Sequence, residues 1–119
     1  MSDSKVHILV RYEDDAAIAD CLDAKLNEEL SIQSWGDEMY ALIENCKKER
    51  VIVNFQNVKF MSSSALRVLI TANNKAKAKR VALFLCRIDE NILEVFKITK
   101  LDTIFKIRPT EVEALHSQI

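Results

Sequence analysis

Two apolar segments, Val51–Phe55 and Val81–Cys86, constrain the fold of this chain more than any other feature. Each is short and almost free of charged side chains, which is typical of strands that are buried on both faces of a sheet. The residues between them, 65–80, place apolar side chains at helical spacing. A strand, a helix and a second strand in this order predict two parallel strands that are joined by a right-handed crossover.

The first thirty residues predict a hairpin. Val6–Val10 alternates as a strand does, and Ala16–Leu22 is a second, weaker strand candidate. The acidic residues Glu13–Asp15 fit a turn between them, so we expect an antiparallel pair. Asp23–Leu30 shows mixed signals and is expected to be a polar connection.

From Ser31 onward the pattern changes to that of an amphipathic helix. Ser31 or Ser34 is expected to cap its start, and Lys47 and Lys48 to close its negative end. Trp35 belongs to the apolar face, so we expect it in the core rather than in a base-stacking site. The apolar positions recur every three or four residues: Ile32, Trp35, Met39, Leu42, Ile43 and Cys46.

The C-terminal third predicts two further helices and one strand. Asp89 is expected to cap a helix, and Ile104–Ile107 to form a short edge strand. Thr110 and Glu113 match a capping box at the start of a last helix. The expected inward faces of these two helices are Ile92, Val95 and Phe96 in the first, and Val112, Leu115 and Ile119 in the second. Together these elements predict a single small α/β domain over residues 1–119, with a mixed β-sheet of about five strands and about four helices.

Composition excludes several classes of function. With 17 basic and 18 acidic residues the net charge is -1, whereas a general nucleic-acid binder carries a basic excess. No apolar run approaches the ~20 residues that span a bilayer, and Met1–Lys5 lacks the order of a signal peptide, so we expect a cytoplasmic protein. Gly36 is the only glycine, which rules out glycine-rich phosphate loops.

Metal and cofactor chemistry has little support. Cys21, Cys46 and Cys86 are widely spaced and lie among apolar residues, so we expect buried, reduced thiols, no metal site and no cofactor. His7 lies in a predicted strand and His116 in a predicted terminal helix, which suggests no catalytic triad. We therefore do not expect an enzyme.

The three serines Ser62–Ser64 stand where a strand and a short loop lead into the second predicted helix. Free N–H groups and the helix dipole at such a position favour an added negative charge. A phosphoryl group would bring about -1.5 to -2 charges to this surface. The simpler interpretation is that one serine caps the helix and the others are turn residues.

The run VIVNFQNVKFMSSSAL, together with the segments that follow through Ile107, resembles the core of the STAS domain of bacterial anti-sigma factor antagonists. In that family, Asp-Ser-Ser/Thr-Gly-Leu opens the helix. Here Ser62 replaces the aspartate and Ala65 the glycine, so Ser62 is expected to cap the helix. The family's glycine before Val81 is also missing, so Lys79-Arg80 must turn without it.

The resemblance implies a phosphorylation switch. In such antagonists the serine after the aspartate is phosphorylated by an anti-sigma factor that is also a serine kinase, and a PP2C-type phosphatase removes the phosphate. Only the unphosphorylated form binds the kinase. Carried onto this chain, the acceptor is Ser63, with Ser64 as second choice, and the implied partner-binding residues are Ser62, Ser63, Ser64, Ala65 and Arg67.

Three functions stay open at this point. The first is the phosphorylation-switched antagonist, and the second is a STAS scaffold or interaction module that does not switch. The third is a sensor that binds a nucleotide or another small anion at the same helix N-terminus. None of the three requires contact with nucleic acid or membrane, or more than a monomer.

Overall fold

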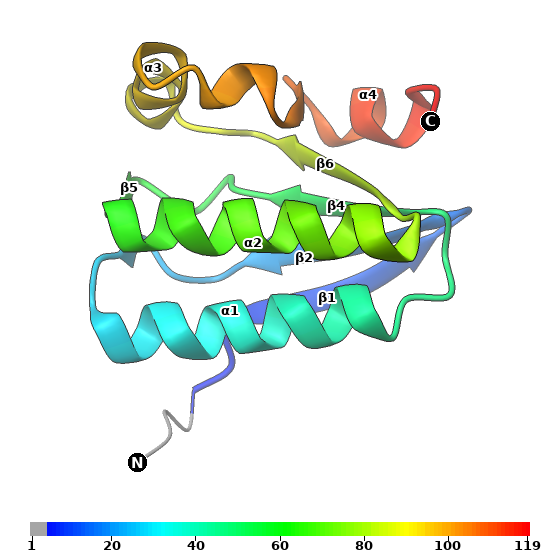
Figure 1. Ribbon diagram of the computed structural model, residues 1–119, viewed down its shortest axis with the longest axis horizontal. Helices are drawn as coiled ribbons and strands as arrows, with labels where there is room; N and C mark the ends of the chain where they lie inside the picture. Colours follow the sequence, from blue (N-terminus) through cyan, green and yellow to red (C-terminus); the bar gives the residue numbers. More distant parts are fainter. Residues whose placement is uncertain (1–4) are drawn as a thin grey trace.

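A computed structural model describes residues 5–119 and contains the predicted mixed sheet (Figure 1). Residues 1–4, most of the segment in which a signal peptide was considered, lie outside the described part. The strand order is β1-β2-β4-β6-β7; β1 and β2 are antiparallel, and every other neighbouring pair is parallel. The strands are β1 (Ile8–Glu13), β2 (Ala16–Cys21), β4 (Arg50–Asn54), β6 (Ala82–Cys86) and β7 (Lys106–Arg108).

Four α-helices follow the strands across the described residues, as expected. They are α1 (Glu29–Glu44), α2 (Ser63–Lys79), α3 (Glu90–Ile98) and α4 (Glu111–His116), with a 3-10 turn, η1, at Leu101–Thr103. Helices α1 and α2 lie side by side over one face of the sheet, and α4 packs on the other (Figure 1). No helix within residues 5–119 is both long and apolar enough to cross a membrane.

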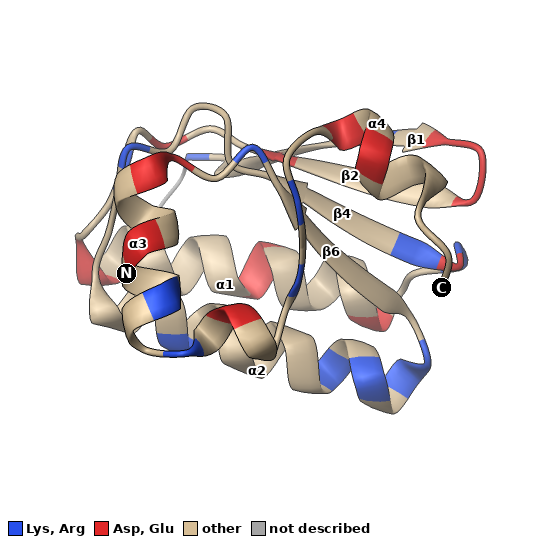
Figure 2. Ribbon diagram, turned by 90° about the horizontal axis from the view of Figure 1, so that it is seen from above, with Lys and Arg blue, Asp and Glu red and all other residues tan. Residues whose placement is uncertain are grey.

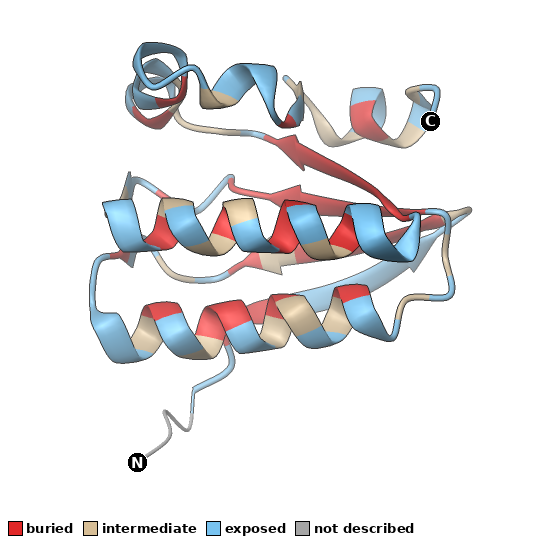
Figure 3. Ribbon diagram, in the orientation of Figure 1, coloured by how far each residue is buried: buried red, intermediate tan, exposed pale blue. Residues whose placement is uncertain are grey.

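Burial on both faces explains the continuous apolar strands (Figure 3). On the α1–α2 face, Val51, Val53 and Leu85 join the larger core, in which Trp35 is fully buried as expected. On the other face, Ile52 and Phe84 join a smaller core. Only residues buried from both sides could form a strand with so few polar positions.

A second, two-stranded sheet corrects the expected polar connection at Asp23–Leu30. This segment forms β3 (Lys25–Leu26), which pairs in parallel with β5 (Phe60–Met61). Two residues per strand are too few to show a period, so the pattern could not reveal them. The pairing fastens the stretch that leads into α2.

Helix α1 begins earlier and ends earlier than predicted. It starts at Glu29, so Ser31 and Ser34 lie inside it and neither serves as N-cap; Glu28 takes that place without a side-chain bond. At the other end Asn45 terminates the helix, and its side-chain amide donates to the Ala41 carbonyl at 2.8 Å. Lys47 and Lys48 consequently lie beyond the helix.

Two strands are displaced from their predicted bounds. Strand β1 begins two residues after Val6 and includes Glu13, because the tight turn needs only Asp14 and Asp15. Strand β7 begins at Lys106 rather than Ile104 because the Ile104 N–H is used in closing η1, where it donates to the Leu101 carbonyl at 3.0 Å.

Helix caps in the C-terminal third were predicted better than helix faces. Asp89 caps α3, and the Thr110 hydroxyl caps α4 by accepting from the Glu113 N–H at 3.2 Å. The predicted inward positions Val95, Val112 and Ile119 are instead exposed, by 43%, 61% and 61%. Short helices present a narrow buried stripe, which in α4 is Ala114.

Candidate phosphoacceptor site and partner surface

Ser62 caps helix α2. Its backbone is extended, and its hydroxyl oxygen accepts a hydrogen bond from the Ala65 N–H at 3.4 Å. This is the role expected of a serine standing where the family has an aspartate. The cap is neutral, so the first turn of α2 carries no acidic side chain.

Ser63 and Ser64 are the first two helical residues, and both are exposed. Their N–H groups are among those that an α-helix leaves unpaired at its start. Within the described residues neither hydroxyl makes a hydrogen bond, so both are accessible to an enzyme. The 17-residue helix adds a positive partial charge at this end.

The two-stranded sheet holds the serine-bearing turn in place. The Leu26 carbonyl accepts from the Ser62 N–H at 2.9 Å, and the Ala24 carbonyl accepts from the Lys59 N–H at 2.7 Å. Val58, directly before Lys59, is fully buried. The turn is therefore fixed to the scaffold, while the serine side chains face solvent.

An apolar surface adjoins the serines. A hollow of about 200 Å³ lies between the α2 N-terminus and α3, and Phe60 and Leu66 contribute to its walls. Phe60 is 49% exposed, and Val95 and Ile98 on α3 are 43% and 75% exposed. We call the exposed side chains Phe60 and Val95, which both line this hollow, the apolar patch. Exposed apolar side chains beside a hollow suit contact with another protein.

The sequence prediction found only part of this surface. Arg67 is exposed four residues after Ser63, one turn along the same side of α2, and makes no ion pair with a described residue. Ala65, by contrast, is fully buried, so its side chain offers a partner no surface. The contribution of α3 was missed, because Val95 was predicted to face inward and is instead exposed.

Most basic side chains of helix α2 lie toward the end of the helix that is distant from the serines. Figure 2 shows Lys and Arg gathered on its last turns, where Lys77 and Lys79 complement the negative end of the helix dipole. The serine end is thus set apart from the basic end.

A second polar groove, of about 540 Å³, lies beside α4. Three of its charged side chains are paired with one another, because the Arg11 guanidinium binds Asp20 at 2.7 Å and Glu111 at 2.6 Å. Hydrogen bonding to Arg11 lowers the pKa of Glu111. This groove therefore holds α4 against the sheet.

The cysteines divide into two kinds. Cys21 and Cys86 are buried, and burial raises the pKa of each thiol to about 12, so both are protonated and unreactive at neutral pH. Cys46 is only partly buried and lines a groove between β1 and α1, which corrects the expectation of three buried thiols. All three are free.

Fold and site together define a small α/β domain that carries accessible hydroxyls at a helix N-terminus beside an apolar patch. The sequence profile of the STAS domain matches residues 11–114, so the chain belongs to the STAS domain family.

Solved structures share this fold. An anti-sigma factor antagonist from Mycobacterium paratuberculosis is similar with a TM-score of 0.80 at 17% identity, covering 97% of this chain and 96% of that one. An anti-sigma-factor antagonist (STAS) domain protein from Planctomyces limnophilus gives 0.79 at 19% identity, covering 91% and 94%. The Bacillus cell fate determinant SpoIIAA in its phosphorylated form gives 0.67 at 17% identity, covering 91% and 96%.

Proposed function

We propose that this protein is an anti-sigma factor antagonist that binds a serine-kinase anti-sigma factor and is switched off by phosphorylation of Ser63. Ser64 is the second choice of acceptor, and a PP2C-type phosphatase is the enzyme that resets the switch. The observation that carries the proposal is the accessible Ser63 hydroxyl at the start of α2, beside the apolar patch. SpoIIAA, which shares the fold, has a phosphorylated and an unphosphorylated form.

The proposed modification suits its position on the helix. The Ser63 oxygen forms a bond to the γ-phosphorus of ATP, the bond to the ADP oxygen breaks, and the hydroxyl proton leaves to a base of the kinase. The product carries about -1.5 to -2 charges, which the free N–H groups of the first turn tolerate. Arg67 is within one helical turn and can pair with the phosphate.

Switching follows from where the charge is placed. An apolar patch binds its partner by excluding water, and a phosphate beside it must be desolvated when that partner docks. Unless the partner supplies a cation, the complex is weakened. The protein itself performs no chemistry in this scheme and needs no cofactor; it acts in the cytoplasm, with neither nucleic acid nor membrane as a direct partner.

The test is incubation with the cognate kinase and ATP, followed by mass spectrometry. We expect a gain of roughly 80 Da, the mass of one added phosphoryl group, on the peptide that contains Ser62–Ser64. Ser63→Ala should abolish the gain, whereas the matched variant Ser64→Ala should keep it. Modification confined to another peptide would refute the proposed acceptor.

The neutral Ser62 cap favours a second candidate, an interaction module that does not switch, since the family's aspartate is missing at this position. The apolar patch could bind a partner whatever the state of the serines. In that case Ser63→Asp would leave partner affinity unchanged, whereas the switch requires it to fall.

A further inference from the structure

Strand β1 is an exposed sheet edge that lacks the usual protection. Its six residues include Leu9, Val10 and Tyr12, which are 56%, 37% and 63% exposed. The opposite edge, β7, has only three residues, two of them the cations Lys106 and Arg108. Short length and positive charge are ordinary defences of an edge against pairing with another chain. Strand β1 is twice as long, and its one cation, Arg11, is already paired within the protein.

The one cation on β1 does not defend the edge. Arg11 is held by Asp20 of β2 and Glu111 of α4, so its charge is neutralised within the protein. A gatekeeper charge acts by remaining solvated and unpaired.

The open hydrogen-bonding groups of β1 can be identified from the ladder. The His7 carbonyl accepts from the Leu22 N–H at 3.0 Å, so it points toward β2. Because bonding direction alternates along an antiparallel strand, Ile8, Val10 and Tyr12 direct their backbone groups outward. The outward Ile8 N–H is satisfied by the Glu38 carboxylate at 3.0 Å. Among residues 5–119 no group accepts from the N–H groups of Val10 and Tyr12, so both can bond to a neighbouring strand.

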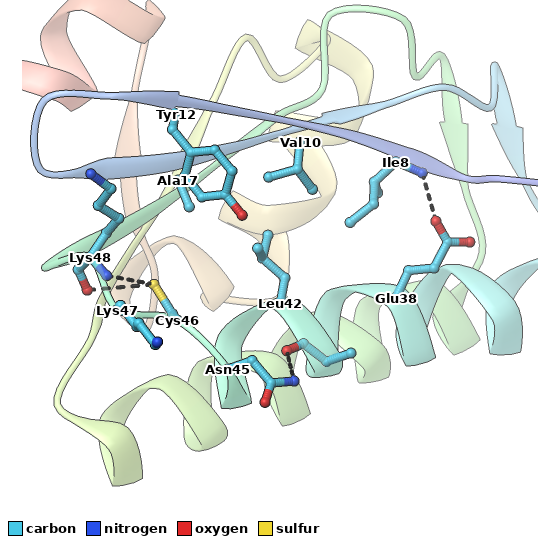
Figure 4. A pocket seen from close by; sticks show the side chains of 11 residues that line it. Ile8, Val10, Tyr12, Ala17, Glu38, Leu42, Asn45, Cys46, Lys47 and Lys48 are labelled. Atoms are coloured by element: carbon cyan, nitrogen blue, oxygen red, sulfur yellow. Dashed lines mark hydrogen bonds between the residues drawn. The ribbon is translucent and has the colours of Figure 1, made fainter.

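A groove of about 620 Å³ runs beneath this edge, between β1 and α1 (Figure 4). Val10 and Tyr12 line it from the strand, and Leu42 from the helix. Its two ends differ in charge: Glu38 lies beside Ile8, whereas Lys47 and Lys48 lie at the far end, near Tyr12 (Figure 4).

We propose that this edge and groove bind a second copy of the same chain, β1 against β1, to form a two-fold symmetric dimer with a continuous sheet. Such an interface must be complementary to itself, because the rotation brings each end of the surface onto the other end in the partner. The groove meets that condition: the axis places the Glu38 end of one copy against the lysine end of the other. Its apolar centre, Val10 and Leu42, lies near the axis.

The register of the pairing follows from charge. Only outward-facing residues can exchange hydrogen bonds across the edge, so Val10 can lie opposite Ile8, Val10 or Tyr12 of the second copy. Glu38 lies beside Ile8, and Lys47 and Lys48 lie near Tyr12, so the opposite charges of the two grooves face one another when Ile8 lies opposite Tyr12. Val10 therefore pairs with its own symmetry mate, and the Tyr12 N–H reaches the Ile8 carbonyl.

Dimerisation does not depend on the proposed switch. Ser63 starts α2, which contacts β5, and the serine end of that helix is separate from the β1 edge. Each copy therefore keeps its serines exposed. A failure of one hypothesis leaves the other untouched.

The test is analytical ultracentrifugation of the full chain over a range of concentrations. We expect twice the mass of one chain at tens of micromolar. Val10→Pro removes an outward N–H without breaking the β1–β2 ladder, and it should raise the dimer dissociation constant at least about a hundredfold, since several backbone hydrogen bonds are lost together. Val10→Thr keeps the N–H and the β-branched shape and should remain dimeric.

A charge variant covers the case in which Val10→Pro disturbs folding. Lys47→Glu should weaken the dimer about tenfold through repulsion by Glu38 of the second copy, while the matched change Lys77→Glu, on α2 away from the groove, should leave it intact. A wild-type chain that stays monomeric at hundreds of micromolar would overturn the proposal. So would a dimer that is indifferent to both Val10→Pro and Lys47→Glu.

Discussion

Arg80 shows what a single departure from the family pattern costs. The chain turns from α2 into β6 at this residue, whose φ of 59° lies in the left-handed region. Its N–H donates to the Lys77 carbonyl at 3.1 Å, so the turn is closed as a glycine would close it. The sequence indicated that Lys79-Arg80 must turn without glycine, and the structure shows that arginine accepts the strained conformation.

Replacing Arg80 by glycine should stabilise the protein. A side chain in the left-handed region costs about 1–2 kcal/mol, and the greater freedom of glycine in the unfolded chain returns about 0.5–1 kcal/mol of that. We expect a net gain of roughly 0.5–1 kcal/mol in the free energy of unfolding in urea. Arg80→Ala, which keeps Cβ, should show almost no gain; an equal gain for both variants would mean that the arginine side chain, not the backbone, is the source.

The elements that could be predicted from sequence are those in which many consecutive residues follow one hydrophobic period. Strands β4 and β6 and helix α2 each repeat one period over several residues, so few alternatives fit. Strands β3 and β5, with two residues each, exist only because segments far apart in the chain meet. Helix α4 itself was predicted from its capping box, but its attachment to the sheet was not: Arg50 donates to the Ala114 and Ser117 carbonyls at 2.7 Å and 2.8 Å, and no local sequence pattern indicates that contact.

The attachment of α4 predicts a pH-dependent stability. Glu111 accepts hydrogen bonds from Arg11 and from Asn54, and the bond to Arg11 is the main cause of its lowered pKa. A lowered carboxyl pKa contributes stability above the ordinary value of 4.5, and this is lost as pH falls through the folded-state value. Because the pair is partly exposed, we expect Glu111→Gln to cost only about 1 kcal/mol at pH 7.

Chemical denaturation at several pH values checks this contribution. The difference between wild type and Glu111→Gln should shrink steadily as the pH is lowered below 4.5. Glu113→Gln, on the exposed side of the same helix, serves as the control and should change stability little at any pH. A constant difference for Glu111→Gln from pH 7 to pH 3 would contradict the assigned ion pair.

At the scale of the whole molecule, the candidate site is assembled from separate parts of the chain. Ser62–Ser64 could be singled out from sequence because strand, loop and helix start are contiguous, and because the run resembles a known motif. Val95 could not, since only the fold brings α3 near the start of α2, where Val95 and Leu66 line the same hollow. The prediction that Val95 faces inward was wrong. The helical period shows which residues share a face of α3, but not how much of that face the rest of the fold covers.

We expect one phosphate on Ser63 to weaken partner binding strongly, and calorimetric titration measures this effect. The cognate kinase anti-sigma factor is titrated with unmodified protein and with protein that is fully phosphorylated on Ser63. If the switch operates, phosphorylation weakens binding at least about a hundredfold, equivalent to ~2.7 kcal/mol. The Ser63→Ala variant binds as the unmodified protein does. Equal affinity of the phosphorylated and unmodified forms would contradict the switch.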